Sequence, residues 1–396
     1  MSRIFITGIG VISPIGNTVS ENRAALIAGK CGMTKLEMLT SNFADKMPFG
    51  EVKISTEDFK KKLNISEPSV TRTSLLALHA LKEALHNASL SENEITSQDT
   101  ALIGASTVGG MCLTDEMYKD ANLQTEGSPY LSSYDFASVI LFLQQHYKVN
   151  GIVNTINTAC SSSANAIMYG ARLMKQGLAK RAIVGGVDSL SKFTINGFNS
   201  LGILSNEICQ PFDENRKGLN LGEGAAFLVL EKEEDCARKE IFAELSGYFN
   251  SNDAFHPSSL SDEGNGPYLA MEGALKSANL KASQIDFINA HGTGTGNNDA
   301  VESRAMQRLF LDGVPDFAST KSNIGHTLGA AGAIEAVYSI LNLKYQEVYA
   351  GLNFKTPIPE TGLIPVSSYS KKEMKHVLSN SFGFGGNCSS LLFSKV

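Results

Sequence analysis

The chain has 396 residues, of which 42% are hydrophobic and 36 are glycine, a composition typical of a globular α/β protein. Its net charge of −6 and its few basic clusters argue against nucleic-acid binding. No uncharged apolar run is long enough to span a membrane, and the six cysteines lack the spacing of a zinc site or a disulfide framework. We therefore expect a protein of the reducing cytoplasm, with no membrane segment and no bound metal.

Predicted strands alternate with predicted helices along the whole chain. In the first half we expect strands over 4–7, 101–106, 151–158, 181–188, 225–231 and 243–249, and helices over 22–27, 73–88 and the stretch after residue 160. In the second half we expect helices over 266–279, 299–311 and 329–343, and strands over 285–290 and 391–393. This alternation indicates an α/β fold with a largely parallel sheet. No linker separates the halves, so we predict one tightly joined unit of two pseudo-equivalent halves, residues 1–250 and 251–396.

A single cysteine, Cys160, lies between the extended stretch and the helix that follows it. Ser161, Ser162 and Ser163 are residues that can cap a helix start. The sulfur would then lie near a helix N-terminus, where free N–H groups and the macrodipole favour an anion and lower the pKa of a thiol. The alternative is an ordinary buried apolar cysteine, and this stretch alone leaves the two interpretations equally open.

Three glycine-rich stretches combine reactive side chains with loop residues: 289–296 with His291, 320–332 with Lys321 and His326, and 380–387 with Phe382 and Phe384. Only seven histidines occur in the chain, and two of them lie in these loops. A lone histidine of this kind is usually structural. Two of them, together with a candidate thiolate and a lysine, favour a functional site.

The four motifs closely resemble those of the β-ketoacyl-acyl-carrier-protein synthases, in the elongating branch that uses Cys, His and His. They read Thr158-Ala-Cys-Ser-Ser, Ala290-His-Gly-Thr-Gly-Thr, Thr320-Lys-Ser-Asn-Ile-Gly-His-Thr-Leu-Gly-Ala-Ala-Gly and Asn380-Ser-Phe-Gly-Phe-Gly-Gly-Asn. The similarity runs from Ile6-Thr-Gly-Ile-Gly to the terminal strand. It implies a thiolase-like fold, a layered α-β-α-β-α sandwich of two pseudo-equivalent halves, and usually a homodimer.

The resemblance also implies a reaction. Cys160 would take an acyl chain from the phosphopantetheine arm of an acyl carrier protein, with its own amide and that of Phe384 as the oxyanion hole. Malonyl-carrier would then lose CO₂, and neutral His291 and His326 would stabilise the enolate. Attack on the acyl group would release a 3-oxoacyl chain two carbons longer. No cofactor is implied beyond the carrier's own arm.

Further roles follow from the resemblance alone. Lys321 would support the histidines and keep them neutral. Glu335 and Asp299 would be supporting acids, Thr293 and Thr295 would hold the pantetheine arm, Phe384 would gate the acyl pocket, and Val108 and Phe382 would line that pocket.

The sequence also departs from the pattern of housekeeping members. Gln210, Lys217 and Leu219 are substitutions near the expected mouth of the site, and residues 60–72 carry fewer Lys and Arg than the family's carrier-docking face. An acidic carrier is steered by such basic residues. A dedicated carrier and a specialised polyketide or polyene pathway are therefore alternatives to primary fatty acid synthesis.

Two competing functions remain. A thiolase would use a second cysteine, but Cys388 follows its glycine-rich run instead of preceding one. A chain-length-factor-like partner subunit would share the fold but replace the nucleophile, which is retained here as Cys160. The sequence therefore favours the condensing enzyme and leaves the acyl chain, the carrier and the choice of homo- or heterodimer open.

Overall fold

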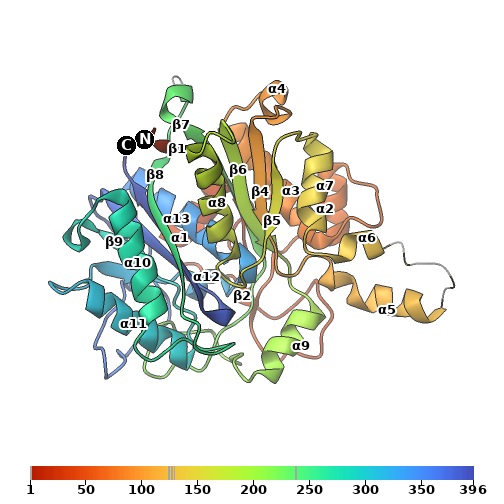
Figure 1. Ribbon diagram of the computed structural model, residues 1–396. Coiled ribbons are helices and arrows are strands. Elements are labelled where there is room, and N and C mark those ends of the chain that lie inside the picture. Colours follow the sequence, from red (N-terminus) through yellow and green to blue (C-terminus); the bar gives the residue numbers. More distant parts are fainter. Residues whose placement is uncertain (1, 124, 126–127, 129, 237–238) are drawn as a thin grey trace.

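The computed structural model describes residues 2–123, 125, 128, 130–236 and 239–396 (Figure 1). Its main feature is a ten-stranded sheet that consists of two five-stranded halves. The first half contains β1 (Ile4–Ile12), β4 (Thr100–Ala105), β5 (Val153–Ile156), β6 (Arg181–Asp188) and β7 (Gly224–Lys232). The second contains β8 (Ala243–Asn252), β9 (Phe287–Asn289), β10 (Asp316–Ala318), β13 (His376–Phe382) and β14 (Asn387–Ser394).

The two halves have the same topology. Their strand orders are β5-β4-β6-β7-β1 and β10-β9-β13-β14-β8, so in each half the third, second, fourth, fifth and first strands follow one another from the edge inwards. The three outer strands of each half run parallel, and the two inner ones join antiparallel. β1 and β8 connect the halves through the pairs Phe5–Glu244 and Ile6–Ala243. The predicted pseudo-equivalence is confirmed.

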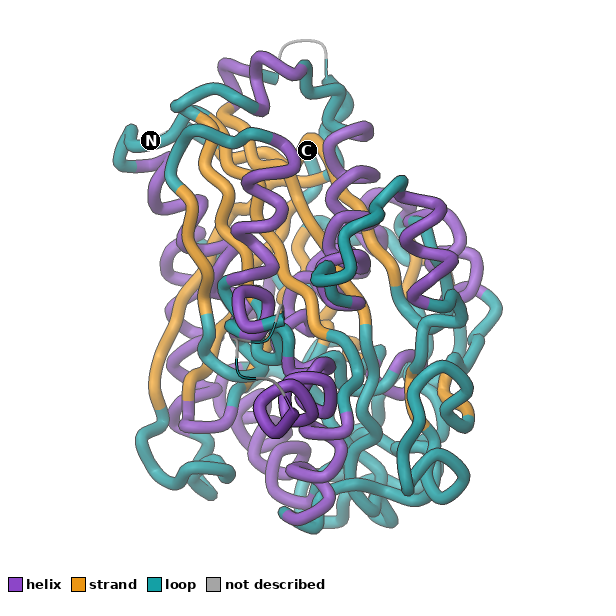
Figure 2. Tube along the Cα trace, turned by 90° about the vertical axis from the view of Figure 1, so that its right-hand side faces the viewer, coloured by secondary structure: helices purple, strands orange, loops and turns teal. Residues whose placement is uncertain are grey.

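Helices form layers around these sheets (Figure 1). α3 (Arg72–Asn87) and α7 (Ser138–Tyr147) pack on the outer face of the first half, and α10 (Asn265–Ala278) packs on the second, with α11 (Gly296–Leu309) against it. α8 (Ser162–Lys175) and α13 (Ala331–Tyr345) contact each other and strands of both halves, so they form the middle layer. Figure 2 shows the strands running through the molecule between helices. This is the predicted α-β-α-β-α sandwich.

The remaining elements are short or peripheral, and within the described ranges no helix has the length and apolar character that crossing a bilayer requires. The helices are α1 (Val19–Ile27), α2 (Thr56–Leu63), α4 (Glu92–Ile95), α5 (Thr114–Leu123), α6 (Leu131–Tyr134), α9 (Lys192–Ser200) and α12 (Lys321–Ile324). Single 3₁₀ turns cover Met111–Leu113, Glu233–Asp235, Ala282–Gln284, Leu328–Ala330 and Phe384–Gly386. Two small ladders pair β2 (Met33–Thr34) with β3 (Phe49–Gly50) and β11 (Glu347–Val348) with β12 (Ser370–Lys371).

The structure corrects the sequence at several places. The sheet is not largely parallel, because four of its nine strand pairings are parallel and five are antiparallel. β8 pairs with β14 from Glu244 to Asn252, so the strand that begins at Ala243 belongs to the second half, which was expected to start at residue 251. The strands expected over 151–158 and 285–290 shorten to 153–156 and 287–289. β13 was not expected, because the polar residues Ser379, Asn380 and Ser381 do not resemble a buried strand until both of its neighbours are in place.

The middle layer generates a stability prediction. α13 is buried on all sides, in keeping with a sequence that is apolar around the whole helix, and Ile340 has no exposed surface. We expect Ile340→Ala to lower the free energy of unfolding by about 3 kcal/mol, because the cavity cannot collapse between two sheets. Chemical denaturation would measure it, with exposed Leu178→Ala as the control. An equal effect of the two variants would contradict a rigid middle layer.

Candidate active site

The four motifs meet at one cavity because each follows the carboxyl end of a strand. Cys160 lies between β5 and α8, His291 follows β9, the Lys321–His326 segment follows β10, and Phe384 follows β13. Carboxyl ends of parallel strands lie at the same edge of a sheet, which brings together the segments after β9, β10 and β13. β5 belongs to the other half of the sheet, and the packing of α8 against α13 brings Cys160 to them. The resulting cavity has a volume of about 300 Å³, and Cys160, His291, His326, Phe382 and Phe384 all line it. The structure therefore brings together residues more than two hundred positions apart in the sequence.

Cys160 sits on a tight turn in which Ala159 has a φ of 53°, a conformation that L-residues rarely adopt. α8 begins two residues later, and the sulfur accepts hydrogen bonds from the N–H groups of Phe384 and of Cys160 itself. Gly383 allows this approach, since a Cβ there would lie 2.7 Å from the Thr158 carbonyl oxygen. These two amides are the pair expected to form an oxyanion hole.

The lowered pKa that we expected for Cys160 is not found. The side chain is buried, and burial raises the pKa of the thiol to about 11, although the Lys321 charge and the N–H group of Phe384 act in the opposite direction. A helix N-terminus favours a thiolate, but removing water from the sulfur favours the neutral thiol more strongly. Ser161 stands at the N-cap without capping the helix, because its hydroxyl donates to Thr158 and Asn387.

The hydrogen bonds of His291 and His326 define which nitrogen carries the proton. The Nδ1 atom of His326 accepts from the Leu328 N–H at 3.2 Å, and that of His291 lies 3.2 Å from the Lys321 ammonium, which can only donate. Burial, followed by the charge of Lys321, holds the pKa of both imidazoles well below the usual value of histidine. Both rings are therefore neutral and carry their proton on Nε2. Their centroids lie 5.5 Å apart at the cavity.

Lys321 uses all three of its N–H donors inside the protein. They go to His291 Nδ1, to the His291 carbonyl oxygen at 2.5 Å and to Glu335 Oε1 at 2.5 Å. Lys321 and Glu335 are each 1% exposed, so the pair is fully enclosed. Burial raises the pKa of Glu335 to about 7 against the opposing charge of Lys321. The structure thus places Glu335 in contact with Lys321 and not with the cavity.

Asp299 holds the loop that carries His291. Its carboxylate accepts from the N–H groups of Thr293, Gly294 and Phe212. Glu302, one turn later on α11, accepts from the N–H groups of His291 and Gly292, and burial raises its pKa to about 7. We did not predict Glu302 from the sequence. Its spacing of three residues from Asp299 on one helix face was the available signal.

Asp188, at the end of β6, is another buried carboxylate that the sequence did not reveal. It accepts from the N–H groups of Thr107, Val108 and Gly329, and so joins the loop after β4 to the segment that follows His326. Val108 itself does not line a cavity, contrary to our expectation. It packs with Leu190, Leu219 and Leu328, because its side chain points into the core while Thr107 faces the open space.

Phe384 stands between two cavities. Its ring stacks on Phe198 with centroids 6.0 Å apart. On one side is the cavity with the histidines. On the other side is an apolar cavity of about 440 Å³. Four residues line both cavities: Cys160, Phe198, Leu201 and Phe384. The other residues that line the apolar cavity are Thr107, Met111, Asn157, Ala159, Phe193, Thr194, Gly197 and Leu328. Phe382 lies only on the histidine side, 5.7 Å from His291, and not in the apolar cavity.

Of the three residues that depart from the resemblance, Gln210, Lys217 and Leu219, only Leu219 lines the histidine cavity. Thr293 and Thr295 line this cavity, with their hydroxyls 2.9 Å apart. Leu219 also lines it, whereas Lys217 forms an exposed ion pair with Glu207. Gln210 donates to the Asn353 carbonyl oxygen. These contacts show what each substitution does locally.

No cluster of three or more His, Cys, Asp or Glu side chains suited to a metal ion occurs in the part of the chain that the structure describes. The buried oxygens Glu335 Oε2, Asn289 Oδ1 and Ser379 Oγ have no hydrogen-bond partner. Asn289 and Ser379 are paired on β9 and β13, and the Asn289 amide donates to the Glu335 carbonyl oxygen.

An enclosed thiol, two amides directed at it and two neutral imidazole donors define a class of enzyme that forms acyl-cysteine intermediates and stabilises an enolate. The family model "Beta-ketoacyl synthase, N-terminal domain" matches residues 1–236, and "Beta-ketoacyl synthase, C-terminal domain" matches residues 242–355. The chain belongs to the β-ketoacyl synthase family, and it is an acyltransferase with the thiolase-like fold.

Individual relatives agree over their full length. The chain is 32% identical to 3-oxoacyl-[acyl-carrier-protein] synthase 2 of Vibrio harveyi, covering 100% of this chain and 99% of that protein. The ishigamide ketosynthase/chain length factor structure matches with a TM-score of 0.93 and 28% identity, over 100% of this chain and 99% of that one. A type II polyketide ketosynthase in complex with its acyl-carrier protein matches with a TM-score of 0.89 and 28% identity, over 100% and 99% of the two chains.

The environment of Cys160 predicts how its reactivity depends on pH. With a thiol pKa of about 11, we expect the rate of alkylation by iodoacetamide to rise about tenfold per pH unit from pH 7 to pH 10, because only the thiolate reacts. Mass spectrometry of the Cys160 peptide would measure it, with Cys160→Ala correcting for other cysteines. A plateau near pH 7 would show that the helix N-terminus dominates over burial.

Proposed function

We propose that this chain is an elongating β-ketoacyl-acyl-carrier-protein synthase of fatty acid or polyketide synthesis, with Cys160, His291 and His326 as its reacting residues. The observation that carries the proposal is the pair of Nε2–H donors of the two neutral histidines, which line one cavity with the cysteine. The reaction needs no cofactor beyond the phosphopantetheine arm of the carrier.

The first half-reaction is transfer of the acyl group to Cys160. The sulfur attacks the thioester carbonyl carbon, the bond between that carbon and the pantetheine sulfur breaks, and the proton of the cysteine leaves with the pantetheine thiol. The N–H groups of Cys160 and Phe384 receive the oxyanion, because they already point at the sulfur. Since the thiol is neutral at rest, its proton moves during the attack and not before it.

The second half-reaction is the condensation. The malonyl group loses CO₂, and the electron pair of the broken C–C bond forms an enolate whose oxygen accepts from His291 Nε2 and His326 Nε2. The carbanion then attacks the acyl carbon, and the bond to the Cys160 sulfur breaks. Neutral donors suit this step because their hydrogen bonds strengthen as negative charge develops on the enolate oxygen. They also add no buried positive charge to the cavity. Lys321 and Glu335 hold the His291 ring in that tautomer.

The apolar cavity supports the proposal that the acyl chain bound to Cys160 is aliphatic. It borders Cys160, and carbon atoms of Met111, Phe193, Phe198, Leu201 and Leu328 dominate its walls. Thr293 and Thr295 line the other cavity, and we propose that they hold the pantetheine arm there. The acyl carrier protein as donor, the homodimer and the cytoplasmic location stay predictions for this chain. The complex of a related ketosynthase with its carrier supports the first of them.

The nucleophile can be tested directly. We expect incubation with acyl-carrier thioesters to add the mass of one acyl group per chain, and Cys160→Ala to abolish that addition, because no other thiol lines either cavity among the described residues. Intact-mass spectrometry would measure it. Loading from CoA thioesters alone would favour a thiolase-like enzyme, and no loading in a folded protein would favour an accessory subunit.

A variant of His326 can show whether this residue acts in the condensation and not in the acyl transfer. We expect His326→Ala to retain acyl loading of Cys160 and to lower the rate of malonyl-carrier decarboxylation by about 10²–10³, because one enolate donor is lost. Release of CO₂ from labelled malonyl-carrier would measure this step. His79→Ala is the control, since that histidine lies on α3 and contacts the Asn17 carbonyl oxygen. Equal loss of loading and decarboxylation would contradict the assigned role.

A further inference from the structure

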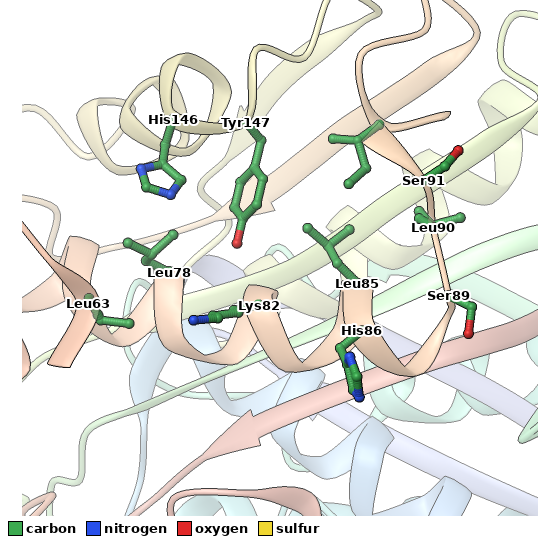
Figure 3. Close-up of a pocket in the computed structure, with 11 residues that line it drawn as sticks. Leu63, Leu78, Lys82, Leu85, His86, Ser89, Leu90, Ser91, His146 and Tyr147 are labelled. Carbon is green, nitrogen blue, oxygen red and sulfur yellow. The ribbon is translucent and has the colours of Figure 1, made fainter. Parts of the chain in front are cut away.

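A second cleft opens on the outer face of the first half, between α3, α4 and the end of α7 (Figure 3). It has a volume of about 590 Å³ and shares no residue with the two cavities at Cys160. Leu78, Leu85 and Ile95 form a buried floor, and Leu63 and Leu90 are half-buried walls. A concave apolar surface with a few polar groups is typical of a small-molecule site.

The polar groups of this cleft include an ammonium, two imidazoles and a phenol, whereas the Ser91 hydroxyl donates to Glu94. Leu78, Lys82 and Leu85 share one face of α3, and Figure 3 shows Tyr147 pointing from α7 towards that face. Within the described ranges, no hydrogen bond or ion pair engages the Lys82 ammonium, the His146 ring or the Tyr147 hydroxyl. His79, on the same helix, contrasts with them because its Nε2 contacts the Asn17 carbonyl oxygen at 2.8 Å.

Among the residues that the structure describes, no carboxylate lines the cleft, and two neighbouring acidic side chains are engaged elsewhere. Glu83, next to Lys82, accepts from the N–H groups of Val11 and Val19. Glu94, on α4, accepts from Ser91 and pairs with Arg181. The positive charge of Lys82 is therefore not compensated at this surface.

We propose that this cleft binds an amphiphilic anion, with its aliphatic chain on the leucine floor and its carboxylate or phosphate head at Lys82, His146 and Tyr147. The floor offers hydrocarbon contacts, and an ammonium, an imidazole and a phenol supply donors to one anionic head. Free fatty acids and lysophospholipids both present this chemistry. Burial raises the pKa of Tyr147 to about 12, so its hydroxyl keeps the proton that it donates.

Calorimetric titration with decanoate, decyl phosphate and uncharged decyl maltoside tests the proposal. We expect the two anions to bind and the maltoside not to bind, and the tighter anion identifies the head group. Lys82→Glu should weaken binding of the anions about tenfold or more, because it replaces attraction by repulsion. Lys30→Glu is the matched control, since Lys30 is also exposed, forms no ion pair with any described residue and lies outside the cleft.

Decanoate could also enter the apolar cavity at Cys160, so a second readout locates it. A photoreactive decanoate should label peptides that contain residues 63–95 or 146–147, and Lys82→Glu should lose this labelling while keeping its melting temperature. Equal affinity of Lys82→Glu and the unchanged protein would overturn the proposal. So would labelling confined to peptides around Cys160, Phe193 and Phe198.

Discussion

The three hydrogen bonds of the Lys321 ammonium are the interaction on which the site depends. They join the loop after β9, the short helix α12 and the central helix α13. Their acceptors are the Nδ1 atom and the carbonyl oxygen of His291 and the carboxylate of Glu335. A buried charge is stable only when its donors are satisfied. The same hydrogen bonds also orient the His291 imidazole. One lysine side chain therefore both stabilises the buried charge and positions a reacting group.

The duplicated fold explains why such a site exists at all. In each half the three parallel strands end at one edge, and one helix covers them, α8 in the first half and α13 in the second. The nucleophile belongs to the first half and the enolate donors to the second. They face each other only because α8 and α13 pack together between the sheets. The middle layer is thus both the core of the protein and the scaffold of its reacting groups.

Burial sets the electrostatics of the catalytic cavity. It raises the pKa of Cys160 and lowers those of His291 and His326, so all three reacting groups are neutral at rest. Chemistry there proceeds through directed N–H groups whose contribution grows as charge develops. The cleft between α3 and α7 is the opposite case, because the ammonium group of Lys82 is exposed and remains available to an anion from solution.

The sequence by itself determined the family, the alternation of strands and helices and the four motifs, because each motif is local and its residue types are specific. Tertiary structure decided the rest. β13 is recognisable only beside β9 and β14, and Glu302 and Asp188 matter through N–H groups of distant loops. The predicted places of Val108 and Phe382 in the acyl pocket were wrong because they depend on the direction of each side chain, which the sequence does not show. The pKa of Cys160 was predicted with the wrong sign because a helix start is visible in sequence, whereas enclosure from water depends on every segment that packs around the sulfur.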